Sequence, residues 1–551
     1  MRPPHRRLAA LLAIAAAVPL IQATVLVRVY WLTAQALAPQ VSAVWPYDSY
    51  HDMRWLLVYH NSWLMFGAGL LALIALRGVL SATLVSLAWP TRLPRPPYRA
   101  LLRRNIAVAA LTAVIVLPFA AYSIAASAVS LSWFLFASLA PMALLAPFLQ
   151  RMAVVRSPWR GLPSARLVGW SLLDLVVLSL AAWAVFGTAA AGMMWAPIVA
   201  AVAGAVNGLM WRQTVRAALL QTRVRWRWVP VMPIVVAVAL AIPLTTQVLA
   251  QPNERTRNTL APPIFTEPLP PQVPYAVVLL DGHNSAYDGR PAADPNVERF
   301  SYVGLDSARR PLPYRSQATH RSLESSSQLL AAQVETLHRR TGRPIALVAR
   351  SEGVMVALTY LRDRPGSPVR ALAMFSPLVR AGRTYYPPPE AKTGWGLAAG
   401  WLLRAMFKVT TIGSKAPSTP DEPFIRSLLD GAPFYRYHTL CPIPGVRMIA
   451  FLPITTAAEY PPGQPIRIPV VQVVAFHGGI IRRQSATDQL TDFLSGAYVN
   501  RRLRVYGPIE RLSEAWHAPS LALPLNPVWR PATTPGPPFT PKRFCGPIKR
   551  S

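Results

Sequence analysis

The feature that most constrains the fold is a series of apolar stretches in the first half of the chain. A transmembrane helix needs about 20 consecutive, mostly apolar residues. Seven stretches of about that length lie at roughly 8–28, 57–76, 105–126, 130–149, 167–186, 190–210 and 230–250. We therefore predict an all-α polytopic membrane domain over residues 1–252, with about seven transmembrane helices.

One shorter apolar stretch, residues 78–89, leaves the number of spans open between seven and eight. It is shorter than a membrane span requires, so an interfacial or re-entrant segment is the better interpretation. The second predicted span is also weak, because it includes His60 and Asn61. If residues 78–89 cross the membrane, the count becomes eight and the C-terminal half changes sides.

The distribution of arginine predicts the orientation of these spans. Residues 1–252 contain 20 Arg, and 18 of them fall at the N-terminus or after the second, fourth and sixth spans. The other connections hold only Arg28 and Arg54. Because cytoplasmic loops are rich in Lys and Arg, we predict a multi-pass plasma-membrane protein with its N-terminus in the cytoplasm and its C-terminal half outside. The first span then serves as a retained signal anchor.

Asp174 is the one acidic residue inside a predicted span. Ionisable groups within a membrane are candidates for function, so a transport or proton-relay role is one hypothesis. The spans show no recurring Gly or Pro breaks, no acidic pairs and no inverted repeat of the kind that transporters use. An anchor, or a platform facing the lipid, is the favoured interpretation.

The second half of the chain has a different pattern, in which short apolar runs alternate with helical periodicity. A Pro-rich linker, 253–274, leads into it. Strands are expected at 275–281, 300–306, 345–349, 371–376, 446–452 and 468–476, and helices at 322–339, 353–362 and 486–495. This alternation predicts a mostly parallel sheet with helices on both faces, within residues 275–522.

Residues 380–440 interrupt the alternation, as a cap insertion would. Its apolar helix, 394–407, would close over an apolar substrate, rest on the bilayer or pack on the sheet. The tail 523–551 is Pro-rich with little periodicity, and we expect it to be disordered or loosely attached.

A serine turn joins the third predicted strand to its helix. The sequence Ala349-Arg350-Ser351-Glu352-Gly353 differs at one position from G-x-S-x-G. In that motif the serine occupies a strained corner between strand and helix, and its hydroxyl is exposed above the sheet. An ordinary turn with a capping serine has the same residue types, so the decision depends on the other groups that catalysis requires.

His477 directly follows the last predicted strand, in Ala475-Phe476-His477. With the serine turn and the cap insertion, residues 275–520 resemble an α/β-hydrolase domain. The resemblance implies the chain order serine, acid, histidine, with Ser351 as nucleophile and His477 as base. His517 is the reserve base. The family places the acid after the penultimate strand, where Glu459 is the one acidic residue; otherwise the triad is incomplete.

The resemblance also implies an oxyanion hole, made of backbone N–H groups that hold the negative oxygen of the reaction intermediate. One donor would be the N–H of Glu352. The other would come from Gly282 or His283, in the loop after the first strand. A simple turn is the alternative for these loop residues.

No metal or cofactor is predicted. The chain has no His-Glu-x-x-His motif, no P-loop and no glycine-rich dinucleotide motif in the right context. The two cysteines, Cys441 and Cys545, lack metal-ligand spacing and would form one disulfide if they meet in an oxidising compartment.

The leading hypothesis is a membrane-anchored serine hydrolase with an extracytoplasmic catalytic domain. It would cleave an ester, thioester or amide bond of a lipid or acylated envelope component through an acyl-enzyme on Ser351. Its partners would be the lipid bilayer and this substrate, and not nucleic acid, because the arginines of the first half follow the membrane topology. The alternatives are a non-catalytic α/β-hydrolase-like protein that binds a ligand or partner outside the cell, and a transporter that depends on Asp174.

Overall fold

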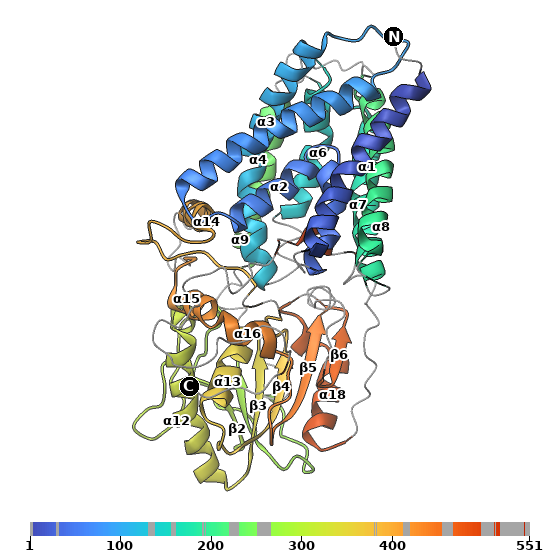
Figure 1. Cartoon of the computed structure of the whole chain (residues 1–551). Helices are drawn as coiled ribbons and strands as arrows, with labels where there is room; N and C mark the ends of the chain where they lie inside the picture. Colours follow the sequence, from blue (N-terminus) through green and yellow to red (C-terminus); the bar gives the residue numbers. More distant parts are fainter. Residues whose placement is uncertain are drawn as a thin grey trace.

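A computed structural model shows a helical region stacked on an α/β region (Figure 1). It describes residues 4–28, 32–129, 138–155, 161–189, 192, 194–219, 231–250, 266–379, 381, 383–410, 419–453, 467–475, 477–497, 512, 514–517, 519 and 545.

The helical region holds most of the predicted apolar stretches as long helices. They are α1 (Pro4–Arg28), the 3-10 helix η1 (Leu32–Ser42), α2 (Tyr47–Val58), α3 (Trp63–Ala88), α4 (Tyr98–Val129), α6 (Ala140–Met152), α7 (Ala165–Ala189), α8 (Trp195–Ala218) and α9 (Val231–Ala250). Within the described residues, four segments are long and apolar enough to cross a membrane: His5–Arg28, Trp63–Ala88, Tyr98–Ile124 and Ala165–Thr188. Four of the seven predicted spans therefore correspond to helices of sufficient length and apolar character to cross a membrane. The helices α6, α8 and α9 overlap the other three.

The interpretation of residues 78–89 as a separate interfacial segment was wrong. Residues 78–88 form the second half of α3, and Trp89 is its C-cap residue; Ser62 caps the other end by accepting a hydrogen bond from the Met65 N–H at 3.3 Å. Arg77 had suggested a loop, but it is buried within α3 and pairs with Asp52 of α2. A buried arginine can stay in a helix when carboxylates neutralise it, so Arg77 is not evidence for a cytoplasmic connection.

The α/β region contains one six-stranded sheet in the order β2-β1-β3-β4-β5-β6. All neighbouring strands are parallel. The strands are β1 (Ala276–Leu280), β2 (Val297–Arg299), β3 (Ile345–Arg350), β4 (Val369–Phe375), β5 (Arg447–Pro453) and β6 (Val470–Val473). The central strands β1 and β3 are buried almost throughout, as expected for a parallel sheet with both faces covered.

Helices connect these strands. They are η3 (Ser316–His320) and α12 (Leu323–Thr341) before β3, α13 (Glu352–Asp363) before β4, and α14 (Leu397–Thr410), α15 (Pro423–Asp430) and α16 (Ala432–His438) between β4 and β5. After β6 come η4 (Ile480–Arg482), α18 (Gln484–Leu494) and η5 (Glu514–Trp516). The insertion between β4 and β5 coincides with the predicted cap region.

The predicted second strand, 300–306, is misplaced. The strand is β2, which ends at Arg299, and the chain then leaves the sheet. The apolar letters that suggested a strand are Phe300 and Tyr302, which are fully buried in a loop at the sheet edge. Gly304 has φ 100°, a left-handed value that interrupts extended backbone.

The strand order determines where a site can form. The chain adds β2 on one side of β1 and then β3, β4, β5 and β6 on the other. In such sheets ligands bind beyond the carboxyl ends of the strands, at the point where the order reverses. That point lies between β1 and β3, so it brings Asp281 and Ser351, the residues that follow these two strands, to the same edge.

The helix α14 connects the two regions of the chain (Figure 1). The side chain of His60 accepts a hydrogen bond from the Ala398 N–H at 2.8 Å. The backbone oxygen of Asn61 accepts from the Gly394 N–H at 2.8 Å. Trp401 of α14 meets Trp63 of α3 edge to face, with ring centroids 6.1 Å apart. The predicted cap helix is therefore docked on the helical region.

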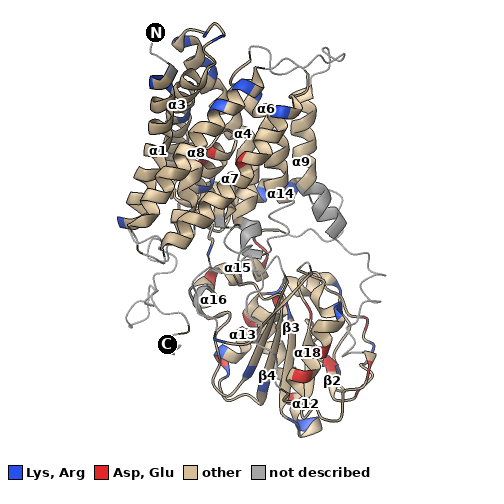
Figure 2. Cartoon of the chain, turned by 90° about the vertical axis from the view of Figure 1, so that its right-hand side faces the viewer, with Lys and Arg blue, Asp and Glu red and all other residues tan. Residues whose placement is uncertain are grey.

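Charge is distributed unevenly between the two regions. In the helical region most Lys and Arg positions lie toward the end remote from the α/β region, whereas Asp and Glu lie mostly in the α/β region (Figure 2). This agrees with the arginine pattern of the sequence.

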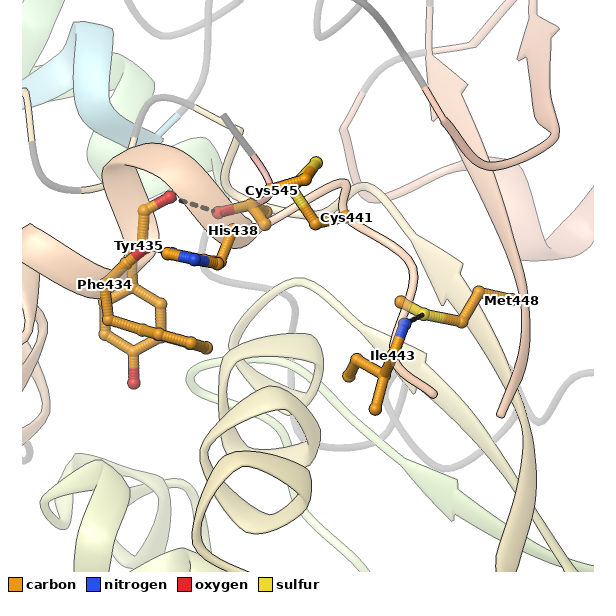
Figure 3. Close-up of a disulfide and its surroundings, with 8 residues drawn as sticks. Phe434, Tyr435, His438, Cys441, Ile443, Met448 and Cys545 are labelled. Carbon is orange, nitrogen blue, oxygen red and sulfur yellow. Dashed lines mark hydrogen bonds between the residues drawn. A yellow bond between two sulfur atoms is a disulfide. The ribbon is translucent and has the colours of Figure 1, made fainter. Parts of the chain in front are cut away.

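Cys441 and Cys545 form a disulfide, with their Cα atoms 5.2 Å apart (Figure 3). Cys441 lies between α16 and β5, close to the turn in which the Ile443 N–H donates to Met448 Sδ at 3.3 Å. The disulfide fastens one point of the Pro-rich tail to the α/β region. The rest of the predicted tail, 523–551, lies outside the described residues.

Candidate active site

Ser351 occupies a sharp corner between β3 and α13. Its φ of 51° and ψ of −115° are unusual for a residue with a side chain. Such a conformation costs about 1–3 kcal/mol and persists only where the surrounding structure enforces it. Here the Ser351 N–H donates to the Phe375 carbonyl at 2.9 Å, which ties the corner to β4. The strained corner leaves the serine side chain half-buried instead of enclosed.

The small residues around the serine have a packing reason. A Cβ added to Gly353 would lie 2.8 Å from the Leu280 oxygen and 2.9 Å from the Asp281 oxygen. Helix α13 can therefore approach β1 only if this position is glycine. Ala349 is fully buried in β3, and its methyl group fits there. This explains why the first glycine of the motif is replaceable and the second is not.

The structure places His477 beside Ser351. The His477 Nε2 atom lies 3.0 Å from the Ser351 Oγ atom, which is hydrogen-bonding distance. His477 follows β6, and its backbone oxygen accepts a hydrogen bond from Ser376 Oγ at 2.5 Å. Ser376 itself follows β4, so the carboxyl ends of β4 and β6, which lie on either side of β5, position the imidazole against the serine.

The environment of His477 favours the neutral ring. Burial, and then the positive charge of Arg350, lower the pKa of His477 to about 4. Its second ring nitrogen, Nδ1, is buried and makes no hydrogen bond to any described residue. The predicted acid, Glu459, lies in residues 454–466, outside the described residues. That segment directly follows β5, so the acid position remains a prediction.

The loop after β1 lies against the serine. A Cβ on Gly282 would be 3.0 Å from Ser351 Cβ and 3.6 Å from Ser351 Oγ, so backbone alone fills this position. The Tyr302 hydroxyl donates to the Asp281 carbonyl at 2.7 Å and fixes the peptide that carries the Gly282 N–H. Across the serine, the first N–H groups of α13, including that of Glu352, have no partner within their helix. Two sets of backbone donors therefore flank Ser351.

Sequence reasoning missed Arg350, which lies between Asp281 and His477. Its guanidinium is 3.2 Å from the Asp281 carboxylate, which also pairs with Arg299. Arg350 thus anchors the β1 loop and contributes positive charge near the serine. Its place next to the serine in the turn was visible in the sequence, but nothing there indicated its direction.

The half-buried side chain of His283 and the fully buried side chain of Glu352 belong to a separate polar cluster. His283 Nδ1 lies 3.0 Å from the Glu352 carboxylate, and His283 Nε2 lies 2.9 Å from Glu422. Burial opposes a charge on His283, but these two carboxylates raise its pKa to about 10. Burial raises the pKa of Glu352 to about 7, against the effect of His283. Only the backbones of these two residues are available for an oxyanion hole.

The reserve base, His517, is far from this role. Its carbonyl accepts a hydrogen bond from Arg54 of α2 at 2.7 Å, and its neighbour Trp516 donates to Ser179 of α7 at 2.8 Å. His517 therefore packs against the helical region, and His477 is the histidine that meets Ser351.

No family model and no curated protein sequence matches the chain. Among solved structures, the chain is similar to 2-hydroxy-6-oxo-6-phenylhexa-2,4-dienoate hydrolase (BphD) from Rhodococcus sp. strain RHA1, at 15% identity. The similarity covers 42% of this chain and 92% of that one, with a TM-score of 0.22. A similarity at this level does not indicate a function for this chain.

Proposed function

We propose that the chain is a membrane-anchored serine hydrolase of the α/β-hydrolase type. The observation that carries the proposal is the 3.0 Å contact between Ser351 Oγ and His477 Nε2 at a strained strand-to-helix corner. A serine hydroxyl is a weak nucleophile at neutral pH, and an adjacent neutral imidazole is the group that activates it.

The reaction follows from this geometry. Ser351 Oγ attacks the carbonyl carbon of the substrate as His477 Nε2 takes its proton. Backbone N–H groups of Gly282 or His283 and of Glu352 stabilise the negative oxygen that forms. The bond to the leaving group then breaks, and His477 returns the proton to that group. Water, activated by the same histidine, hydrolyses the acyl-enzyme and restores Ser351.

Two observations support an extracytoplasmic active site. Most of the described arginines of the helical region lie toward the end away from the α/β region, which the positive-inside rule assigns to the cytoplasm. The Cys441–Cys545 disulfide belongs to the α/β region, and disulfides persist in oxidising compartments. Both favour a plasma-membrane protein with its α/β region outside.

The position of α14 favours a lipid or acylated envelope component as substrate. This helix belongs to the insertion between β4 and β5, and it packs beside α3, which is apolar enough to cross a membrane. Trp401 and Val409 of α14 are each 57% exposed, an apolar surface suited to the edge of a bilayer. Contact of this surface with the bilayer would hold the site close to the acyl chains of membrane lipids.

The test measures hydrolysis of p-nitrophenyl esters, from acetate to palmitate, by the full-length protein in detergent. The variants Ser351→Ala and His477→Ala should each lower kcat/KM by at least about 10³-fold, because each removes a group on which the others depend. Ser367→Ala is the matched control, since Ser367 precedes the amino end of β4, whereas Ser351 follows the carboxyl end of β3. Equal activity of Ser351→Ala and the wild type would refute the proposal.

One observation favours a second candidate, a non-catalytic protein that binds a ligand or partner outside the cell. The His477 Nδ1 atom has no acid among the described residues. A triad without its acid retains geometry but loses most of its rate. Under this alternative, a Ser351→Ala strain keeps the biological function of the wild type. Under the hydrolase proposal, it resembles a deletion strain.

The transporter hypothesis also has a distinct test. Asp174 lies in α7 and is fully buried within the helical region. If transport is the function, Asp174→Asn abolishes it and Ser351→Ala leaves it unchanged. The hydrolase proposal predicts the reverse for ester hydrolysis.

A further inference from the structure

Three polar side chains from distant parts of the sequence meet next to the serine corner. His283 follows β1, His320 ends η3, and Glu422 precedes α15. One ligand atom from each lies within 4.8 Å of the others. We propose that these three side chains bind a divalent transition-metal ion of the zinc class. The proposal goes beyond hydrolysis and does not depend on Ser351.

The distances from the two histidines to Glu422 are close to those between ligands of such an ion. His283 Nε2 lies 2.9 Å from one oxygen of Glu422, and His320 Nδ1 lies 3.1 Å from the other. Ligand atoms about 2.0–2.1 Å from a tetrahedral zinc are about 3.3 Å apart. The two nitrogen–oxygen distances differ from this value by a few tenths of an ångström, whereas the widest pair of ligand atoms is up to 4.8 Å apart, so the side chains must move closer together to hold the ion. Two histidines and one glutamate are also the ligand set of open zinc sites, in which water or substrate takes the fourth position.

The second nitrogen of each ring is already oriented. His283 Nδ1 lies 3.0 Å from Glu352, and His320 Nε2 lies 2.9 Å from the Asn284 side-chain oxygen. Histidines that bind a metal almost always donate their other N–H to a carboxylate or carbonyl, which fixes the tautomer and aims the free nitrogen at the ion. Glu352 and Asn284 have this relation to the two proposed ligands.

Without a cation the arrangement is unsatisfied at His320. An imidazolium at His283 can donate to both Glu352 and Glu422. Once His320 Nε2 donates to Asn284, however, the lone pair of His320 Nδ1 faces the Glu422 carboxylate, another electron-pair donor. The Glu422 Oε2 atom is buried and makes no hydrogen bond to any described residue. An unpaired buried oxygen is costly. One divalent ion would satisfy all three donors, and the two carboxylates Glu352 and Glu422 would balance its charge.

The chemistry of the donors selects the metal. Imidazole nitrogens suit zinc, copper, iron and nickel, whereas Mg²⁺ and Ca²⁺ prefer oxygen ligands. No cysteine contributes, because Cys441 and Cys545 are bonded to each other. The side chains of His283 and His320 are 24% and 15% exposed, so an ion has a route of entry.

The proposed metal site would stabilise the arrangement of the loops around Ser351. His283 directly follows Gly282, Glu352 directly follows Ser351, and Glu422 belongs to the insertion between β4 and β5. An ion held by these side chains ties the oxyanion loop to the serine corner and to the insertion. We therefore expect metal to position the Gly282 backbone without contacting the reacting atoms.

The sequence prediction of no metal site followed from a search for local motifs. The three ligands lie in separate loops, and no fixed spacing relates them. The strand order brings His283 and Glu352 to the same end of the sheet, but the positions of His320 and Glu422 depend on the three-dimensional paths of their loops.

The test measures Zn²⁺ binding to full-length, tag-free protein in detergent after treatment with a chelator. Competition with a chromophoric zinc indicator should give one Zn²⁺ per chain, and Co²⁺ should give the visible absorption of a tetrahedral site. Glu422→Gln, which keeps the size of the side chain, and His320→Ala should each weaken binding at least about 100-fold, and Glu352→Gln about 10–100-fold. Circular dichroism checks that each variant is folded.

His338→Ala is the matched control, because His338 is a half-buried histidine in the last turn of α12 and is not one of the proposed ligands. It should bind Zn²⁺ as the wild type does, and so should Ser351→Ala, which separates this proposal from the hydrolase proposal. Absence of stoichiometric Zn²⁺ in folded wild-type protein would overturn the metal site. So would equal binding by the wild type, Glu422→Gln and His320→Ala.

Discussion

At the scale of single residues, the candidate site depends on the charge of Arg350 and its effect on the protonation of His477. Arg350 points away from the core toward Asp281, and its charge acts on the imidazole of His477. A neutral imidazole is the form that accepts the proton of Ser351. The lowered pKa of His477 keeps this form populated well below neutral pH.

This gives a prediction for the pH profile. Because the pKa of His477 is about 4, kcat/KM should stay constant down to about pH 5. Below pH 4 it should fall about tenfold per pH unit, as His477 becomes protonated. Replacing Arg350 by Met removes a positive charge that disfavours the imidazolium, so the acidic limb should move to higher pH.

Arg350→Lys keeps the charge and is the matched control, with a profile close to that of the wild type. A wild-type limb near pH 7 would contradict the assigned environment. It would indicate that a carboxylate, such as Glu459, faces His477 Nδ1 and stabilises the imidazolium.

At the scale of elements, the inner strands of the sheet could be predicted from the sequence, whereas its edge strand β2 could not. The runs that became β1, β3, β4 and β5 are buried and continuous, and such runs are recognisable without any structure. The predicted strand at Phe300 is wrong because apolar residues that are buried in a loop have the same sequence pattern as those of a buried strand. The boundary between the predicted span 57–76 and residues 78–89 is wrong because an arginine in a sequence usually marks the end of a span. Here Arg77 stays inside α3, because Asp52 neutralises its charge.

In the candidate site, too, the residues that follow strands could be predicted and those in loops could not. Ser351 and His477 follow strands, so the strand pattern itself indicated that they meet. The cluster of His283, His320 and Glu422 involves long loops, whose paths no periodicity records. The nearness of Arg350 to His477 depends on a side-chain direction, which only three-dimensional packing determines.

The close approach of α13 to β1 predicts the effect of a single methyl group. Gly353→Ala would place Cβ within 3 Å of backbone atoms of Leu280 and Asp281, which cannot move independently of the sheet. Such overpacking costs about 1–3 kcal/mol. Thermal unfolding of the full-length protein should therefore show a melting temperature several degrees lower.

Gly366→Ala is the control, because a Cβ at this exposed glycine meets no heavy atom within 4 Å. Its melting temperature should stay within a degree of the wild type. Equal stability of the two variants would show that α13 is not held so close to β1.

At the scale of the whole molecule, the two regions are joined by polar as well as apolar contacts. The Ala398 N–H is buried and donates to the side chain of His60, in the turn between α2 and α3. The insertion between β4 and β5 is thus part of the α/β region that carries the candidate active site, and it also contacts the helical region. This arrangement fixes the position of the site relative to the helical region.

Removing the acceptor should weaken the junction. His60→Ala leaves the Ala398 N–H buried without its partner, at a cost of about 1–3 kcal/mol. We expect faster proteolysis between the two regions and a lower melting temperature in detergent. Asn61→Ala is the control, because Asn61 contributes its backbone oxygen, and it should behave as the wild type. Identical proteolysis of both variants would contradict the docking of α14.

The disulfide gives a second test at this scale, of the compartment. Protein isolated under denaturing conditions with free thiols blocked should react with no maleimide before reduction and with two after it, because Cys441 and Cys545 are the only cysteines of the chain. A gel shift of a polyethylene glycol maleimide counts them. Two free thiols in protein taken directly from cells would argue for a reducing compartment and against an external α/β region.

The central claim is that Ser351 is an activated nucleophile, and covalent labelling tests it most directly. The full-length protein is treated with a fluorophosphonate probe, digested, and the modified peptide is identified by mass spectrometry. We predict one adduct per chain, located on Ser351, much slower labelling of His477→Ala, and unchanged labelling of Ser367→Ala. Folded wild-type protein that takes up no probe, or an adduct that persists in Ser351→Ala, would contradict the claim.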